Sequence, residues 1–174
     1  TVVCFGGLLM FHKRNDEFKF NQLQVAECKY PEFTLVNSGK PVENTGEMVL
    51  AVKARYQKSK IKYQKLFEKM GKISNQIIDY FKNGQLSKIN SLMRENERLL
   101  EELRVVGNKA KKIIKKIEKI GGAAKICGAG GIKEGSGMIL AYHTENEILE
   151  NFLVQQKLGF MKVSLDQEGI KQDK

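Results

Sequence analysis

The stretch best suited to bind a ligand is KICGAGGIKEGSGMILAYH, residues 125–143, in which several glycines precede an apolar segment. Glycine lets the backbone adopt positive φ and lets a ligand approach the main chain closely. Successive exposed N–H groups in such a loop form a concave site for an anion. The glycines that could serve in this way are Gly128, Gly130, Gly131, Gly135 and Gly137. The spacing equally suits a flexible connection between two strands, so taken alone it leaves both interpretations open.

Several common kinds of site are not expected in this sequence. The phosphate-binding pattern GxxxxGK[ST] does not occur, and no helix is expected directly after the glycines, as a dinucleotide-binding turn would require. Cys4, Cys28 and Cys127 are widely spaced, and the chain has only two histidines. We therefore expect neither a zinc site nor a disulfide framework, and no metal-binding residues.

The charge balance is basic, with 30 Lys and Arg against 20 Asp and Glu, a net charge of +10. Such a balance is compatible with nucleic-acid binding. The lysines are spread over several expected helices and rarely alternate with aromatic residues, which favours a solvated surface that attracts small anions. Nucleic acid is thus the weaker alternative. The apolar opening VVCFGGLLMF is too short to span a bilayer, so a cytoplasmic protein without a membrane partner is expected.

Periodicity predicts the elements that would position the glycine stretch. Alternating residues predict strands at 2–11 and 17–25, joined by the turn HKRND, and a short strand at 33–36. Helical spacing predicts a first helix that begins at a capping box formed by Asn44 and Glu47. It predicts three further helices, at residues 60–82, 85–103 and 108–120. After them come strands at 123–127 and 137–142, a helix at 144–157 opened by Thr144 and Glu147, and a strand at 160–165.

This order predicts an α+β fold. From residue 33 the pattern is a split βαβ, or ferredoxin-like, antiparallel sheet with extra helices in the first crossover and cover on one face. The initial hairpin does not fit that unit, and resembles the end of a different domain. We therefore expect three parts: residues 1–29 as the terminal hairpin of an otherwise absent N-terminal domain, 30–166 as the main domain, and 167–174 as a polar tail.

Four segments resemble, in order and spacing, the superfamily of galactokinase, homoserine kinase, mevalonate kinase and phosphomevalonate kinase, the GHMP kinases. AKICGAGG resembles the third signature motif of that family, usually written AKLTGAGGGG. The other segments are TVVCFGGLLMF, LVNSGKPVENTGEMVLAVK and RENERLLEELRVV. Together they cover nearly all of the chain and are most similar to the mevalonate kinase branch. The chain is thus identified as the C-terminal part of such a kinase.

The resemblance implies phosphoryl transfer from ATP, with Mg2+, to a small alcohol or phosphate of isoprenoid biosynthesis. Gly128, Ala129, Gly130 and Gly131 would line the active-site cleft, and Thr45 matches a threonine near the substrate, unless it only begins a helix. From the residues themselves, we add Lys133 as a contact for an anionic acceptor and Ser136 as a hydroxyl that reaches phosphate. For both, the alternative is an ordinary loop residue.

The chain also departs from the family pattern. The family's phosphate loop, Pro-x-x-x-Gly-Leu-Gly-Ser-Ser, is absent, and the catalytic aspartate would precede Thr1. We therefore expect no catalytic residue in this chain, the main ATP and Mg2+ contacts outside it, and little activity without the N-terminal half, in the same or a separate chain. Ile132 replaces the fourth glycine of the motif, and Glu43 replaces a basic residue, which argues against mevalonate itself.

The alternatives are therefore phosphomevalonate kinase, another GHMP kinase, or a non-catalytic ligand-binding module of the same fold. A homodimer is a further option. If the glycine loop lines the cleft, Gly130→Val should abolish turnover and leave the fold largely intact, because a β-branched side chain would block the backbone's approach to a ligand.

Overall fold

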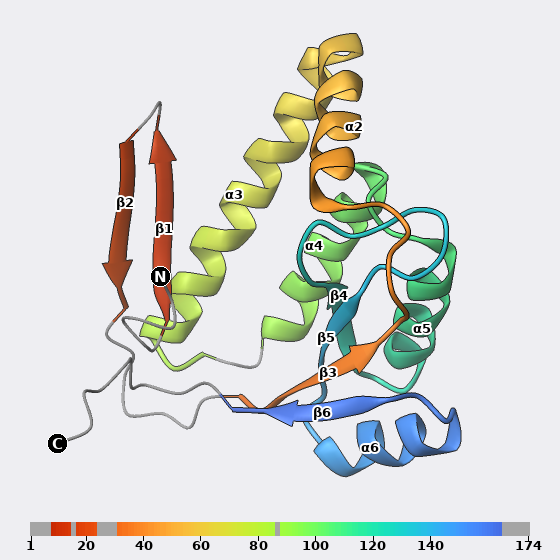
Figure 1. The fold of residues 1–174 in the computed structure, drawn as a ribbon. Coiled ribbons are helices and arrows are strands. Elements are labelled where there is room, and N and C mark those ends of the chain that lie inside the picture. Colours follow the sequence, from red (N-terminus) through yellow and green to blue (C-terminus); the bar gives the residue numbers. More distant parts are fainter. Residues whose placement is uncertain (1–7, 15–16, 24–30, 86–87, 165–174) are drawn as a thin grey trace, which may run out of the picture.

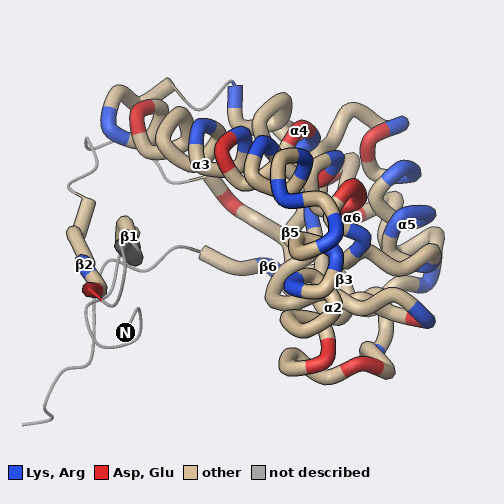
Figure 2. Tube along the Cα trace, turned by 90° about the horizontal axis from the view of Figure 1, so that it is seen from above, with Lys and Arg blue, Asp and Glu red and all other residues tan. Residues whose placement is uncertain are grey.

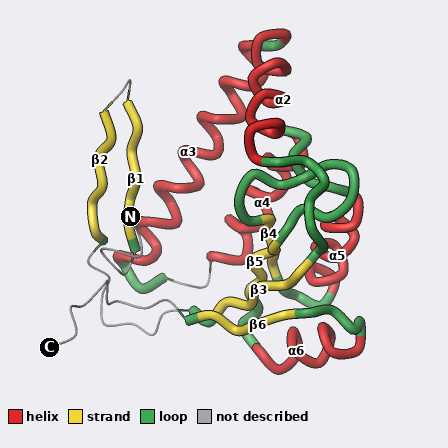
Figure 3. The backbone as a smooth tube through the Cα atoms, in the orientation of Figure 1, coloured by secondary structure: helices red, strands yellow, loops and turns green. Residues whose placement is uncertain are grey.

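The computed structural model describes residues 8–14, 17–23, 31–85 and 88–164 (Figure 1). Figure 3 shows where helices, strands and loops lie in this part of the chain. The elements are β1 (Leu9–Arg14), β2 (Glu17–Gln22), β3 (Phe33–Asn37), α2 (Thr45–Lys58), α3 (Lys60–Lys82), α4 (Ile89–Glu102), α5 (Asn108–Lys119), β4 (Ala123–Ile126), β5 (Met138–Tyr142), α6 (Asn146–Gln155) and β6 (Phe160–Val163).

The main sheet has four strands in the order β4-β5-β3-β6, and every neighbouring pair is antiparallel. Between β3 and β4 the chain forms four helices, α2 to α5, and α6 connects β5 to β6. This is the split βαβ arrangement with an enlarged first crossover, so the predicted fold class is confirmed. The glycine stretch connects β4 to the central strand β5, and the turn before α2 follows the other central strand, β3.

One face of this sheet forms the core. Strand residues alternate between faces, and Val36, Ile126 and Ile139 lie opposite one another across β3, β4 and β5 on the same face. All three are fully or almost fully buried and pack in one cluster with Ile114 of α5 and Leu153 of α6. The charged residues of α5 lie on its other side, because its isoleucines occupy the core stripe.

The other face of the sheet is only partly covered. A smaller cluster joins Phe33 and Ala123 of the sheet to Phe81 at the end of α3 and to Ile89 and Met93 of α4. The hairpin of β1 and β2 lies beside α3 in Figure 1. Its strand β1 extends to Arg14, paired with Glu17. The predicted turn HKRND was therefore too long, since His12 and the two residues after it continue the strand.

Most helix ends follow the local sequence. The capping box at Asn44 is confirmed: its side chain accepts from the Glu47 N–H at 2.9 Å, and the Glu47 carboxylate accepts from the Asn44 N–H at 2.8 Å. Gly84 and Gly121, which follow α3 and α5, adopt the positive φ that glycine tolerates best. These turns end the helices where the sequence indicated.

The second predicted capping box is wrong. α6 begins at Asn146, and its N-cap, Glu145, makes no side-chain capping bond. The buried His143 determines this turn, because its Nδ1 accepts from the Glu145 N–H at 2.9 Å and its Nε2 lies 2.8 Å from the Ile120 carbonyl. At the other end of α6, Lys157 rather than Gly159 takes the positive φ, at 52°.

Other boundaries differ by a few residues. α4 begins at Ile89 rather than 85, β4 ends at Ile126, and β6 ends at Val163. The parts of the predicted strands at 2–7 and 24–25, and residues 86–87 of the predicted helix, lie outside the described residues. The division of the chain at residues 29 and 166 stays a prediction.

Candidate functional site

The glycine loop, defined here as residues 127–137 between β4 and β5, lies directly against other backbone. A Cβ atom added to Gly130 would lie 2.0 Å from the carbonyl oxygen of Val105, and one added to Gly135 would lie 2.1 Å from that of Gly39. Both distances are far below a van der Waals contact. Glycine is therefore required at these two positions for packing within the protein, which excludes a loose connection as the interpretation of this loop.

Two buried serines fasten the loop. The Ser136 hydroxyl donates to the Gly131 carbonyl at 3.0 Å and accepts from the Gly107 N–H at 2.8 Å. The Ser38 hydroxyl accepts from the Ser136 N–H at 2.9 Å and donates to the Gly137 carbonyl at 2.7 Å. Since a hydroxyl has one proton to donate, the Ser136 hydroxyl uses its proton for a hydrogen bond within the loop. Ser136 therefore holds the loop in shape, and its predicted contact to phosphate stays a prediction.

The tip of the loop is held by Glu43. Its two carboxylate oxygens accept from the N–H groups of Ile132 and Lys133, each at 3.2 Å. Desolvation opposes ionisation of this carboxyl, but the backbone N–H donors and the Lys133 ammonium outweigh it, so the pKa of Glu43 lies below its usual value. The carboxylate form is thus the one that fits this position.

A cavity of about 410 Å³ opens between the glycine loop and the rim segment, defined here as residues 38–45. Strand β3 places the rim segment beside the loop, since Asn37 pairs with Met138 at the loop's end. Its lining consists of Lys40, Pro41, Val42, Glu43, Asn44, Thr45, Cys127, Ala129, Gly130, Ser136 and Gly137. The site therefore combines an apolar floor with an ammonium, a carboxylate, a hydroxyl and a thiol.

The structure brings only some of the predicted site residues to this cavity. Thr45, the first residue of α2, lines it together with Ala129, Gly130 and Ser136. Gly128 and Lys133 are exposed on the loop, outside this lining. Gly131 is buried beneath it, against Pro41 and the carbonyl of Gly135. The four glycine-loop positions that the resemblance places along one cleft, residues 128–131, are thus divided between the cavity, a buried turn and the exposed surface of the loop.

Three residues at or near this cavity were not predicted from the sequence. Lys40 and Cys127 line the cavity directly. The Lys109 ammonium lies near the rim segment, 3.3 Å from where a Cβ of Gly39 would be. Lys40 follows the turn at Gly39 and so had a local signal. Lys109 had none, because only the packing of α5 brings it to a residue 70 positions earlier in the chain.

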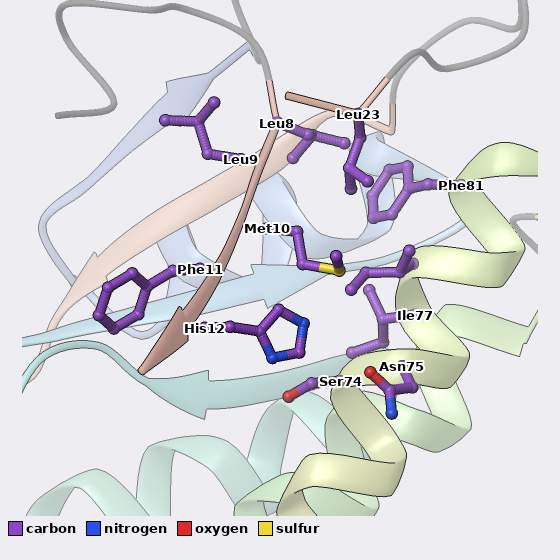
Figure 4. Close-up of a pocket in the computed structure, with 11 residues that line it drawn as sticks. Leu8, Leu9, Met10, Phe11, His12, Leu23, Ser74, Asn75, Ile77 and Phe81 are labelled. Atoms are coloured by element: carbon purple, nitrogen blue, oxygen red, sulfur yellow. The ribbon is translucent and has the colours of Figure 1, made fainter. Parts of the chain in front are cut away.

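A second cavity, of about 320 Å³, lies between the hairpin and α3 (Figure 4). It is mainly apolar, with Met10, Leu23 and Phe81 in its lining, and Figure 4 shows His12 on the side of Ser74. None of the predicted site residues reaches it. Its apolar walls suit an anionic small molecule poorly, so the cavity at the glycine loop is the better candidate.

The basic residues of the chain are distributed over its helices, as the sequence indicated. Figure 2 shows lysines and arginines along α3 and α5, spread over the helices. Within the described ranges, no three His, Cys, Asp or Glu side chains are close enough to hold a metal ion. In the same ranges, no helix is long and apolar enough to cross a bilayer.

Comparison with solved structures finds this fold in kinases. L. major mevalonate kinase in complex with R-mevalonate matches 92% of this chain and 50% of its own, with a TM-score of 0.79 and 19% identity. Methanococcus jannaschii mevalonate kinase matches 89% and 46%, with a TM-score of 0.67 and 21% identity. Streptococcus pneumoniae phosphomevalonate kinase in complex with phosphomevalonate and AMPPNP matches 87% and 44%, with a TM-score of 0.67 and 16% identity.

No protein-family model and no curated protein sequence matches the chain. The chain spans about half the length of the kinases named above. At these identities the likeness establishes the fold, and that fold covers most of the described residues. The resemblance of four sequence segments to GHMP kinases is therefore confirmed for the fold: the chain has the α+β fold of a C-terminal GHMP kinase domain.

Proposed function

We propose that this chain forms the acceptor-side part of an ATP-dependent small-molecule kinase that resembles mevalonate kinase. One observation carries the proposal: the rim segment and the glycine loop, about 90 residues apart, meet around one cavity within a fold shared with such kinases. In this proposal the acceptor is a small alcohol or phosphate of isoprenoid biosynthesis, and the enzyme is cytoplasmic.

The proposed roles follow from the chemistry of each group. The Thr45 hydroxyl and the Lys40 ammonium would bind polar or anionic atoms of the acceptor, since both line the cavity. Ala129 and Gly130 would form a wall without bulky side chains, which lets the acceptor approach the backbone. Gly128, Gly131 and Lys133 would shape the loop around that wall. Catalysis would then rest mainly on positioning the acceptor and on its charge environment.

The remaining chemistry would come from an N-terminal half, in the same or a separate chain. That half would supply the ATP loop, the main contacts to ATP and Mg2+, and the catalytic aspartate. ATP supplies the transferred phosphoryl group. A phosphorylated acceptor is the second candidate, because a phosphomevalonate kinase matches this chain with the same TM-score, 0.67, as one of the mevalonate kinases.

Binding by this chain can be tested without turnover. Cys127 lines the cavity, so a bound acceptor should slow alkylation of its thiol, read on the Cys127 peptide by mass spectrometry. Mevalonate and phosphomevalonate are the probes, and glycerol is the control. Equal alkylation rates with every compound would argue against an acceptor site at the glycine loop.

Turnover needs the complete enzyme. Coding sequence upstream or in an adjacent frame should contain a Gly-Leu-Gly-Ser-Ser loop and a Ser-Gly-x-Asp element. ADP release from the assembled protein is then measured with a panel that includes both probes. Absence of turnover with every acceptor, despite an intact first half, would refute the kinase and leave a ligand-binding module of the same fold.

A further inference from the structure

The two N–H groups at the tip of the glycine loop already bind an anion, which is the chain's own Glu43 carboxylate. One oxygen accepts from Ile132 and the other from Lys133, each at 3.2 Å. Neighbouring backbone N–H groups that point at one pair of oxygens form a cradle for an oxyanion. A phosphate or a carboxylate ligand presents the same pair of oxygens as the Glu43 side chain does.

The position of this cradle relates it to a ligand rather than to the fold alone. Glu43 itself lines the cavity of about 410 Å³, beside Thr45 and on the same rim segment as Lys40. Its carboxylate is only partly buried and can therefore leave the N–H groups without exposing the core. The Lys133 ammonium adds an attraction for negative charge at the same point. Glu43 thus connects the two N–H groups to the cavity, because it lines the cavity and accepts from both of them.

The rest of the loop does not depend on Glu43. Its shape is held by the buried Ser38 and Ser136 bonds and by the Gly131 N–H, which donates to the Val105 carbonyl at 3.0 Å. When Glu43 swings away, the donors of Ile132 and Lys133 would therefore stay in place. A preformed pair of donors with a removable internal occupant is the arrangement that a competing ligand needs.

We propose that the N–H groups of Ile132 and Lys133 form an oxyanion subsite of the cavity, and that Glu43 is its resting occupant, displaced by an anionic group of the ligand. The inference deepens the proposed function and rests on it for the identity of the ligand as an acceptor. Glu43 then determines specificity. A ligand gains from the subsite only if its oxyanion binds the two N–H groups better than the Glu43 carboxylate does, which favours multiply charged groups.

The test uses the 174-residue chain, with inorganic phosphate and acetate as probes, and follows backbone amide resonances by NMR. In Glu43→Ala the subsite is empty, so phosphate should bind roughly five- to tenfold more tightly than to wild type, the size expected from one net hydrogen bond. The largest shifts should fall on the amides of Ile132 and Lys133. Glu134→Ala is the matched control, because it removes a carboxylate from the same loop tip without touching the subsite.

Each result has a defined meaning. Glu134→Ala should change phosphate affinity by less than about twofold, because exposed charges interact only weakly through water and salt. Equal gains in Glu43→Ala and Glu134→Ala, or shifts that fall elsewhere, would overturn the subsite. If Glu43→Ala loosens the loop, Glu43→Gln keeps one acceptor without the charge, and should give a gain between wild type and Glu43→Ala. No gain in either variant would also overturn it.

The two probes separate the sources of the anion. Stronger binding of phosphate would assign the subsite to a phosphoryl group, and stronger binding of acetate would assign it to a carboxylate. Neither measurement needs ATP, an acceptor or the N-terminal half. A failed subsite would therefore leave the kinase proposal standing, and a complete enzyme without turnover would leave the subsite standing.

Discussion

Replacing Gly130 with alanine tests whether the glycine loop is built by close packing. Gly130 has φ of 78°, and an added Cβ would lie 2.0 Å from the Val105 carbonyl oxygen and 2.8 Å from Ile126 Cδ1. A side chain at positive φ costs about 1–2 kcal/mol. The Cβ contact must also lengthen by roughly 1.3 Å to reach the short end of ordinary C···O distances. That shift would break the bond from the Gly131 N–H to the same carbonyl, 3.0 Å long, at a cost of about 1 kcal/mol.

Gly128→Ala supplies the control, because Gly128 also has a positive φ, 67°, but an added Cβ there meets nothing within 4 Å. It should therefore lose only the backbone component, about 1–2 kcal/mol. Urea unfolding of both variants measures the difference, which should be at least about 1 kcal/mol in the direction of a less stable Gly130→Ala. Equal stabilities would refute the argument that close packing requires Gly130.

This comparison also corrects the expectation for Gly130→Val. The sequence suggested that valine would block a ligand and leave the fold largely intact. In the structure the blocked neighbour is the Val105 backbone, which belongs to the protein itself. Valine should therefore destabilise the chain more than alanine does, and a loss of turnover in that variant would not by itself identify a ligand contact.

Three further perturbations test other parts of the structure. Burial raises the pKa of Glu97 to about 7, so the folded chain keeps a proton that the unfolded chain releases above its usual pKa of 4.5. The free energy of unfolding of the wild type should thus decrease as the pH rises from about 5 to about 8, by as much as about 3 kcal/mol. In Glu97→Gln the urea midpoint should be nearly independent of pH, and a pH dependence retained in that variant would contradict this explanation. Ser136→Ala should cost about 1–3 kcal/mol and speed amide exchange in residues 127–137, whereas the exposed Ser74→Ala should not; slow exchange in both would assign the loop's rigidity elsewhere. Asn44→Ala should cost about 1 kcal/mol in thermal unfolding, but Thr144→Ala less than about 0.5 kcal/mol, and similar costs would restore the second capping box.

Sequence patterns were sufficient for the elements and their order because local interactions decide them. The stripe of α3 predicted its limits, Lys60 and Lys82, and the residues Asn44 and Glu47 predicted the start of α2. The change from helical to alternating period at residue 123 indicated the last part of the sheet. The order of these elements then restricted the fold to one common arrangement. Four short resemblances led to the same fold, which the comparison with solved structures confirmed.

The outcome at α6 shows where local reasoning stops. Thr144 and Glu147 have the spacing of a capping box, yet the buried His143 takes the Glu145 N–H. That ring is fixed in turn by the Ile120 carbonyl, 23 residues earlier. The buried contact sets the turn ahead of α6, so the helix begins at Asn146 and the capping box expected at Thr144 does not form. A buried ring must satisfy its nitrogens, because an unpaired polar group costs more inside the protein than at its surface.

The sequence predicted the glycine loop as a candidate site, and only the tertiary structure decided what each of its residues contacts. Composition and spacing indicated only that other atoms could approach the backbone of residues 127–137 closely. They could not determine which atoms, because Val105, Gly39 and Glu43 arrive from distant parts of the chain. The fold assigns Gly130 and Gly135 to packing, Ser136 to an internal bond and the N–H groups of Ile132 and Lys133 to a carboxylate. Local sequence sets what a backbone can do, and long-range packing selects its partner.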